Sequence, residues 1–124
     1  MITGVGTDIV EIKRIRQSYL KYGDRFLERI FTVNELDYCM QKKDPIPSLA
    51  VRFAVKEAFV KAAHLGKYHS NTWTDVSVVL SKEGVPIIEV YNALREVVAG
   101  QRVHLSVSHS EHYATATVVL ERII

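Results

Sequence analysis

Two carboxylates and a lysine are the side chains with the clearest potential for chemistry in this chain. Asp8 follows Gly4 and Gly6 in a short apolar segment, and Glu57 and Lys61 stand four residues apart in a helical pattern. Glycine inside a strand often marks a place where another backbone or a ligand approaches closely. A carboxylate on a mostly apolar helix needs a cation partner, because burial of an unpaired charge is costly. Asp8 and Glu57 are therefore candidate ligands of one ion.

Each carboxylate also has a purely structural interpretation. Asp8 could cap the helix that follows its strand, and Lys61, one turn after Glu57, could neutralise Glu57 in an ordinary ion pair. The competing hypothesis places both carboxylates on magnesium, which takes oxygen ligands from one or two carboxylates, water and substrate phosphates. Lys56 and Lys61 would then be free to bind phosphate as point charges. The residues alone leave both interpretations open.

His109 is a further candidate, because Ser108 and Ser110 flank it at the end of an expected strand. The three side chains could donate hydrogen bonds to a phosphate or a ribose. Two other enzyme classes fit poorly. The chain has no G-x-S-x-G elbow of a serine hydrolase, and the pair Gly4 and Gly6 lacks the third glycine of a dinucleotide fingerprint.

Residues 13–29 contain six basic side chains and only two acidic ones, Asp24 and Glu28. The basic residues are Lys13, Arg14, Arg16, Lys21, Arg25 and Arg29. Such a segment could receive an acidic protein surface, since complementary charge steers encounter. A solvated helix face is the equally weighted alternative. The net charge of +2 is too small to indicate a nucleic-acid-binding protein.

The composition predicts one domain, residues 1–124, of an ordinary globular protein, with 48% hydrophobic and 24% charged residues. No apolar run is long enough to span a membrane, and the first residues lack the pattern of a secretory signal. Cys39 is the single cysteine, which excludes an internal disulfide, argues against cysteine-based zinc sites and suits a reducing cytoplasm. A cytoplasmic location is therefore expected.

The first half of the chain predicts one strand and three short helices before the segment that carries Glu57. Residues 2–9 form the strand, and helical spacing begins at Ile12. Asp24 is expected to cap the second helix. Thr32 and Glu35 fit a capping box for a helix that runs to about residue 40.

The clearest predicted helix is Ser48 to Leu65, with Ser48 as its cap and Gly66 as its end. The prolines of residues 41–47 predict a loop before it. This helix is apolar on most sides, which is typical of a buried helix.

The second half is mostly strands, at residues 76–80, 85–90, 103–108 and 113–120, with a helix expected at 91–99. This order of elements predicts an α+β fold with an antiparallel β-sheet packed on a long central helix.

Four motifs in order along the chain resemble one family, the holo-acyl-carrier-protein synthases, which are the small bacterial 4′-phosphopantetheinyl transferases. The motifs are Ile2-x-Gly4-x-Gly6-x-Asp8-Ile9, Phe26-Leu27-x-Arg29-Ile30-Phe31-Thr32, Arg52-Phe53-Ala54-Val55-Lys56-Glu57-Ala58-Phe59-x-Lys61-Ala62 and Val107-Ser108-His109-Ser110. The resemblance runs almost from end to end. It implies the α+β fold of that family and a homotrimer with active sites between neighbouring subunits.

The resemblance also implies roles at the substrate. Magnesium would be held by Asp8 and Glu57 together with the pyrophosphate of coenzyme A, and Lys61 would contact that pyrophosphate. His109 and Ser110, with Arg52 as a further candidate, would lie near the 3′-phosphate of the coenzyme.

The resemblance implies a carrier protein as the second substrate, and Arg14 and Arg25 would face its acidic recognition helix. Its serine hydroxyl would attack the β-phosphorus of coenzyme A and release adenosine 3′,5′-bisphosphate, in fatty acid biosynthesis. A metal-bound water, Glu57 and Glu35 are the candidates for the general base.

One segment departs from the family pattern. The family carries a glycine-rich loop after the long helix, whereas residues 66–72 of this chain retain only Gly66. We hypothesise that Lys67 or His69 makes side-chain contacts with the coenzyme there. Two alternative functions stay open: a binding protein of this fold without turnover, and a different magnesium-dependent enzyme acting on a nucleotide or diphosphate.

Overall fold

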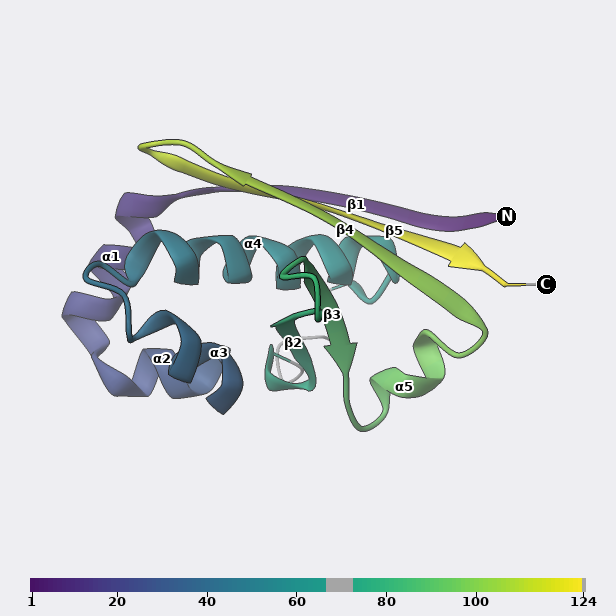
Figure 1. Ribbon diagram of the computed structural model, residues 1–124, viewed down its shortest axis with the longest axis horizontal. Helices are drawn as coiled ribbons and strands as arrows, with labels where there is room; N and C mark the ends of the chain where they lie inside the picture. Colours follow the sequence, from purple (N-terminus) through teal and green to yellow (C-terminus); the bar gives the residue numbers. More distant parts are fainter. Residues whose placement is uncertain (67–72, 124) are drawn as a thin grey trace.

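The computed structural model describes residues 1–66 and 73–123. Three antiparallel strands form one sheet in the order β1 (Ile2–Glu11), β5 (Tyr113–Arg122) and β4 (Gln101–His109). The central strand is the C-terminal one, so both ends of the chain meet in this sheet, as Figure 1 shows. The register pairs Asp8 with Ala116, in the middle of the β1–β5 ladder.

Helix α4 (Ile46–Ala62) lies under the sheet and forms the centre of the core (Figure 1). Its side chains are buried on most sides, as the sequence predicted, and Leu49, Val55 and Phe59 have no exposed surface. On the side away from the sheet lie α1 (Ile12–Tyr22), α2 (Asp24–Ile30), α3 (Val33–Cys39) and the two-stranded sheet of β2 (Val76–Leu80) and β3 (Pro86–Val90). The prediction of antiparallel sheet on a long central helix is thus confirmed, with the strands divided between two sheets.

The bounds of α4 differ from the prediction at both ends. The helix begins at Ile46, and the predicted cap Ser48 lies inside its first turn. Pro47 is tolerated in the first turn, because the N–H group that proline lacks would have no helical partner there. The N–H of Ile46, the first helical residue, donates to Asp44 Oδ1 at 3.2 Å. The helix ends at Ala62, four residues before Gly66, so Gly66 is not its terminator.

Two further helix predictions were wrong and one is confirmed. Asp24 is the first residue of α2 rather than its cap, since Gly23 occupies the cap position. The helix expected at 91–99 is reduced to one turn, α5 (Leu94–Val97). The capping box of Thr32 and Glu35 is present at the start of α3. No helix among the described residues is long and apolar enough to cross a membrane.

Candidate active site

Asp8 owes its position to the close approach of β1 to α4. A Cβ atom at Gly4 would lie 1.8 Å from the Ala62 carbonyl oxygen, and one at Gly6 would lie 1.9 Å from the Ala58 carbonyl oxygen. These distances are far below van der Waals contact, so only glycine fits at either position. The glycines therefore serve backbone packing, and this packing brings Asp8 to the part of α4 that carries Glu57.

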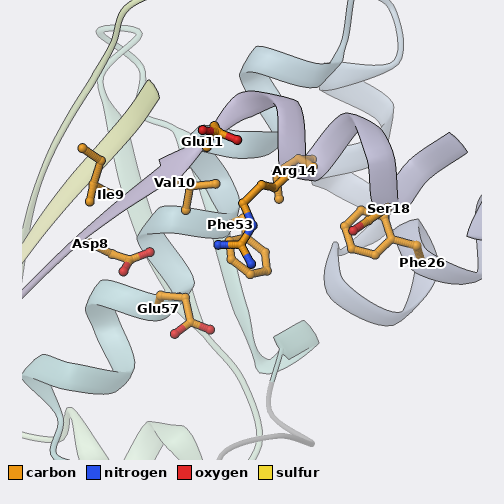
Figure 2. A pocket seen from close by; sticks show the side chains of 10 residues that line it. Asp8, Ile9, Val10, Glu11, Arg14, Ser18, Phe26, Phe53 and Glu57 are labelled. Carbon is orange, nitrogen blue, oxygen red and sulfur yellow. The ribbon is translucent and has the colours of Figure 1, made fainter. Parts of the chain in front are cut away.

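Asp8 and Glu57 line the same pocket, which has a volume of about 390 Å³. Figure 2 shows the Asp8 carboxylate, from β1, near the Glu57 carboxylate, from α4, with Phe53 and Arg14 on the neighbouring wall. Both carboxylates are partly buried. Glu11 is a third carboxylate of the lining. Carboxylate oxygens that line one pocket form a donor set that suits a hard cation such as magnesium.

Lys61 pairs with Asp8. Its ammonium group lies 3.1 Å from Asp8 Oδ1 and donates to the Thr7 carbonyl oxygen at 2.9 Å. The lysine side chain is 53% exposed and that of Asp8 is 17% exposed, so the ammonium group remains open to solvent beside the carboxylate. An exposed ammonium group beside Asp8 can bind an anionic substrate while it balances the carboxylate.

The capping interpretation of Asp8 is wrong. Helix α1 begins at Ile12, its cap residue is Glu11, and no side chain caps it. Asp8 lies four residues before the helix start, which is too far for its carboxylate to accept the first free N–H groups. Its carboxylate points into the pocket instead (Figure 2).

The prediction that Lys56 binds phosphate is also wrong. Its side chain is 1% exposed, and its ammonium group lies 2.8 Å from Glu35 Oε1. It also donates to the carbonyl oxygens of Trp73, at 2.8 Å, and Val76. The pKa of Lys56 is lowered. Burial is the largest cause, and the neighbouring carboxylate of Glu35 partly opposes it. Lys56 is therefore part of the interior.

Glu35 is excluded as the general base by the same geometry. Its side chain is fully buried, and Oε1 accepts the Thr32 N–H at 2.9 Å while Oε2 accepts the Val78 N–H at 2.9 Å. A carboxylate with both oxygens occupied by internal donors cannot reach a substrate hydroxyl.

Arg52 and His109 line a different pocket, of about 380 Å³, which neither Asp8 nor Glu57 lines. The Arg52 guanidinium donates to the Ser48 carbonyl and hydroxyl oxygens at 3.1 and 2.9 Å and lies 4.7 Å from the centre of the Tyr38 ring. Arg52 is 6% exposed, and its Nε has no hydrogen-bond partner within residues 1–66 and 73–123. This second pocket is thus rich in cationic and hydrogen-bonding groups.

Three predicted coenzyme contacts, Lys61, Ser110 and Gly66, are not among the residues that line either pocket. Ser110 is exposed in the turn after β4, where its N–H donates to the Tyr113 carbonyl oxygen at 2.8 Å. Gly66 is exposed and adopts a positive φ of 63°. Lys67 and His69 lie outside the described residues.

Sequence reasoning missed Tyr38 and Lys42, which share the Arg52 pocket. The lysine-rich loop before α4 is the signal that could have found Lys42.

Arg14 and Arg25 lie on adjoining surfaces. Arg14 lines the Asp8–Glu57 pocket, and Arg25 lines a neighbouring groove of about 580 Å³. Ser18 and Phe26 line both hollows, so the two adjoin. Arg29 and Ile30 of the second motif also line the groove, together with Tyr22 and Trp73, which the sequence did not single out.

Known proteins of one family match this chain over almost its whole length. Residues 4–118 match the model of the 4′-phosphopantetheinyl transferase superfamily. The holo-[acyl-carrier-protein] synthase of Protochlamydia amoebophila is 44% identical over 119 residues, which cover 96% of this chain and 98% of that protein. The enzyme of the same name from Chlamydia trachomatis is 48% identical over 118 residues, covering 95% and 98%.

Solved structures agree as well. Holo-[acyl-carrier-protein] synthase from Neisseria meningitidis superposes with a TM-score of 0.85 at 38% identity, over 98% of this chain and 100% of the other. The Helicobacter pylori enzyme, solved in complex with coenzyme A, gives a TM-score of 0.83 at 31% identity, over 94% and 99%. These likenesses confirm the fold that the motifs implied.

Proposed function

The chain belongs to the 4′-phosphopantetheinyl transferase superfamily, and we propose that Asp8, Glu57 and Lys61 form its catalytic centre. It transfers the 4′-phosphopantetheine arm of coenzyme A to a serine of an apo-acyl carrier protein and releases adenosine 3′,5′-bisphosphate. The observation that carries the site is the meeting of β1 and α4, where Asp8 and Glu57 line one pocket and Lys61 pairs with Asp8. We assign residues 1–124 to one transferase domain that serves fatty acid biosynthesis in the cytoplasm.

Magnesium fits the donor set of this pocket. Asp8 and Glu57 would hold it, and the pyrophosphate of the coenzyme and water would complete its oxygen ligands. Among the described residues no group of three or more His, Cys, Asp or Glu side chains could hold a metal, so the further ligands would come from the substrate and from water. When bound, it would neutralise charge that develops on the pyrophosphate during transfer.

The chain's own residues have three tasks in the transfer. Lys61 binds a pyrophosphate oxygen and stabilises the negative charge of the leaving adenosine 3′,5′-bisphosphate. The serine Oγ forms the new bond to the β-phosphorus, and the bond from that phosphorus to the bridging pyrophosphate oxygen breaks. With Glu35 buried, Glu57 is the protein candidate for the base that takes the serine proton.

The 3′-phosphate end of the coenzyme would lie in the Arg52 pocket, near His109 and Ser110, with Gly66 close to the pyrophosphate end. In one chain this pocket is separate from the Asp8–Glu57 pocket. Such a division supports a homotrimer in which one subunit supplies the carboxylates and its neighbour supplies the groups for the 3′-phosphate.

The carrier protein would dock on α1 and α2, where exposed Arg14 lines the pocket and exposed Arg25 lines the adjoining groove. An acidic helix placed there would bring its serine to the Asp8–Glu57 pocket, and opposite charges would speed the encounter.

Intact-mass spectrometry of an apo-acyl carrier protein tests this function. We expect one phosphopantetheine to be added in the presence of the protein, coenzyme A and magnesium, with release of adenosine 3′,5′-bisphosphate. Binding of both substrates without a mass gain, where an established transferase succeeds, would instead identify a binding protein. Hydrolysis of a diphosphate without modification of the carrier would identify a different enzyme.

A further inference from the structure

Lys56 uses all three of its N–H bonds on acceptors from three different elements. The ammonium group pairs with Glu35 of α3, and it donates to the carbonyl oxygens of Trp73, in the short 3₁₀ turn Trp73–Asp75, and of Val76, in β2. An ammonium group has three donors, so none of its bonding capacity is left over. Lys56 therefore fixes two backbone groups of the segment that leads into β2.

Glu35 completes this network. Besides Lys56, its oxygens accept the N–H groups of Thr32 and Val78, at 2.9 Å each. Both charged side chains are almost fully buried, at 1% exposure for Lys56 and none for Glu35. A buried network with every group satisfied holds its members rigidly.

The Trp73 side chain forms part of the wall beside the proposed site. Its indole stacks on the Phe53 ring, with ring centres 5.3 Å apart and planes inclined by 21°. Phe53 lines the Asp8–Glu57 pocket, whereas Trp73 lines the groove that contains Arg25. The stacked pair thus stands where the pocket and the groove meet.

We propose that Lys56 is a positioning residue, which holds the Trp73 backbone so that the Trp73–Phe53 stack shapes the docking groove for the carrier protein. The inference rests on the proposed transferase function. Asp8 and Glu57 are held by β1 and by α4 itself, so loss of Lys56 should affect carrier binding more than the chemical step.

The test compares Lys56→Met with Lys82→Met, the same change at an exposed lysine of the β2–β3 turn. Trp73 is the only tryptophan, so its fluorescence emission and its quenching by acrylamide report on this position alone. We expect Lys56→Met to raise the quenching constant and to raise KM for the carrier about tenfold, the effect of losing one charged hydrogen bond, while kcat stays within about twofold. Lys82→Met should match the wild type.

A second variant covers the case in which Lys56→Met fails to fold because Glu35 is left unpaired. The double variant Glu35→Gln/Lys56→Met removes both charges. It still removes the hydrogen bond from Lys56 to the Trp73 carbonyl oxygen, so the same changes in quenching and in KM are expected. Folded variants with wild-type quenching and carrier KM would overturn the proposal, as would a fall in kcat alone. A wild-type protein that transfers nothing would contradict the proposed function instead, and the quenching data would still decide whether Lys56 holds Trp73.

Discussion

At the scale of single residues, the account depends on two carboxylates that the fold brings to one pocket. Asp8 comes from the first strand and Glu57 from the central helix, 49 positions later in the chain. Their roles differ from that of the buried Glu35, although all three carry the same functional group. What separates them is access to the pocket, which depends on tertiary packing.

The variants Asp8→Ala and Glu57→Ala should each lower magnesium-dependent turnover by at least about a hundredfold. The reason is that a catalytic metal contributes several kcal/mol of transition-state stabilisation. Both side chains are only partly buried, so thermal unfolding should change little. Initial rates of carrier modification, beside circular-dichroism melting curves, measure both effects.

Asp37→Ala is the matched control, because Asp37 is an exposed carboxylate of α3 away from the pocket. It should retain wild-type turnover. If Glu57→Ala unfolded the protein while Asp8→Ala turned over normally, Glu57 would be a structural residue and the shared cation would be refuted.

The residue scale also shows where sequence reasoning fails. Lys56 and Lys61 lie in the same motif, and both were predicted to bind phosphate. Helix geometry turns Lys56 toward α3 and β2 and Lys61 toward β1. The direction of each side chain depends on which elements pack on which side of α4, and the helical period alone does not contain that information.

At the scale of elements, the site depends on how closely β1 packs on α4. Gly6→Ala would place a methyl group 1.9 Å from the Ala58 carbonyl oxygen, and neither backbone can yield without moving the strand. We expect destabilisation of about 1–3 kcal/mol, as for other overpacked sites. Turnover should fall further than stability alone explains, because the movement separates Asp8 from Glu57. Urea unfolding and initial rates measure the two losses.

Gly84→Ala provides the comparison. Gly84 has a φ of 79° in the β2–β3 turn and open space around it, so alanine there costs about 1 kcal/mol from backbone strain. Stability should fall while turnover per folded molecule remains that of the wild type. Equal effects of the two substitutions on turnover would mean that the β1–α4 contact does not position the site.

The start of α4 supplies a pH-dependent prediction. Arg16 lies 2.7 Å from Asp44, whose carboxylate also accepts the Ile46 N–H, and the hydrogen bond from Arg16 holds the pKa of Asp44 below its usual range. Because the folded pKa is the lower one, this stabilisation is present above about pH 4 and is lost as the pH falls through the folded value.

Arg16→Ala should therefore reduce the free energy of unfolding at neutral pH by less than about 1 kcal/mol, since the pair is half exposed and screened by solvent. The difference between variant and wild type should shrink as the pH falls below about 4 and vanish once the Asp44 carboxylate is protonated in both folded proteins. Urea titrations across this range measure it, and a difference that persists in acid would show that Arg16 stabilises the fold by another route.

Most elements could be predicted from the sequence, because their signals are local. The capping box of α3, the alternation of β2, β4 and β5 and the apolar surface of α4 each depend on neighbouring residues. The start of α4 was missed because Pro45 and Pro47 were read as loop residues, whereas Pro47 lies in the first helical turn. Tertiary contacts decide such cases.

At the scale of the whole molecule, one face of the three-stranded sheet packs on α4, and the opposite face of the sheet is not covered by any other described element of Figure 1. Exposed apolar side chains lie along that face, with Val5 60%, Ile9 63% and Tyr113 46% exposed. Together with the division of the proposed site between two pockets, this surface supports the proposed trimer. The alternation of residues along a strand predicts which side chains share a face of the sheet, but it contains no information about what packs against that face.

Val5→Asp should convert the proposed trimer to a monomer, because the charge would be buried at the proposed subunit interface and such burial is costly. Transfer should be lost with the assembly. Light scattering coupled to size-exclusion chromatography measures the mass, and Val85→Asp, at an exposed valine of the hairpin, serves as the control. A wild-type monomer with full activity would contradict the proposed intersubunit site.

The most direct test of the whole account is the magnesium dependence of carrier modification. Protein stripped with a chelator is incubated with coenzyme A and apo-acyl carrier protein, with and without added magnesium, beside Asp8→Asn and Glu57→Gln. We predict full phosphopantetheine addition by the wild type only after magnesium is restored, and almost none by either variant. Transfer by the stripped wild type, or by either variant at the wild-type rate, would contradict a cation held by Asp8 and Glu57.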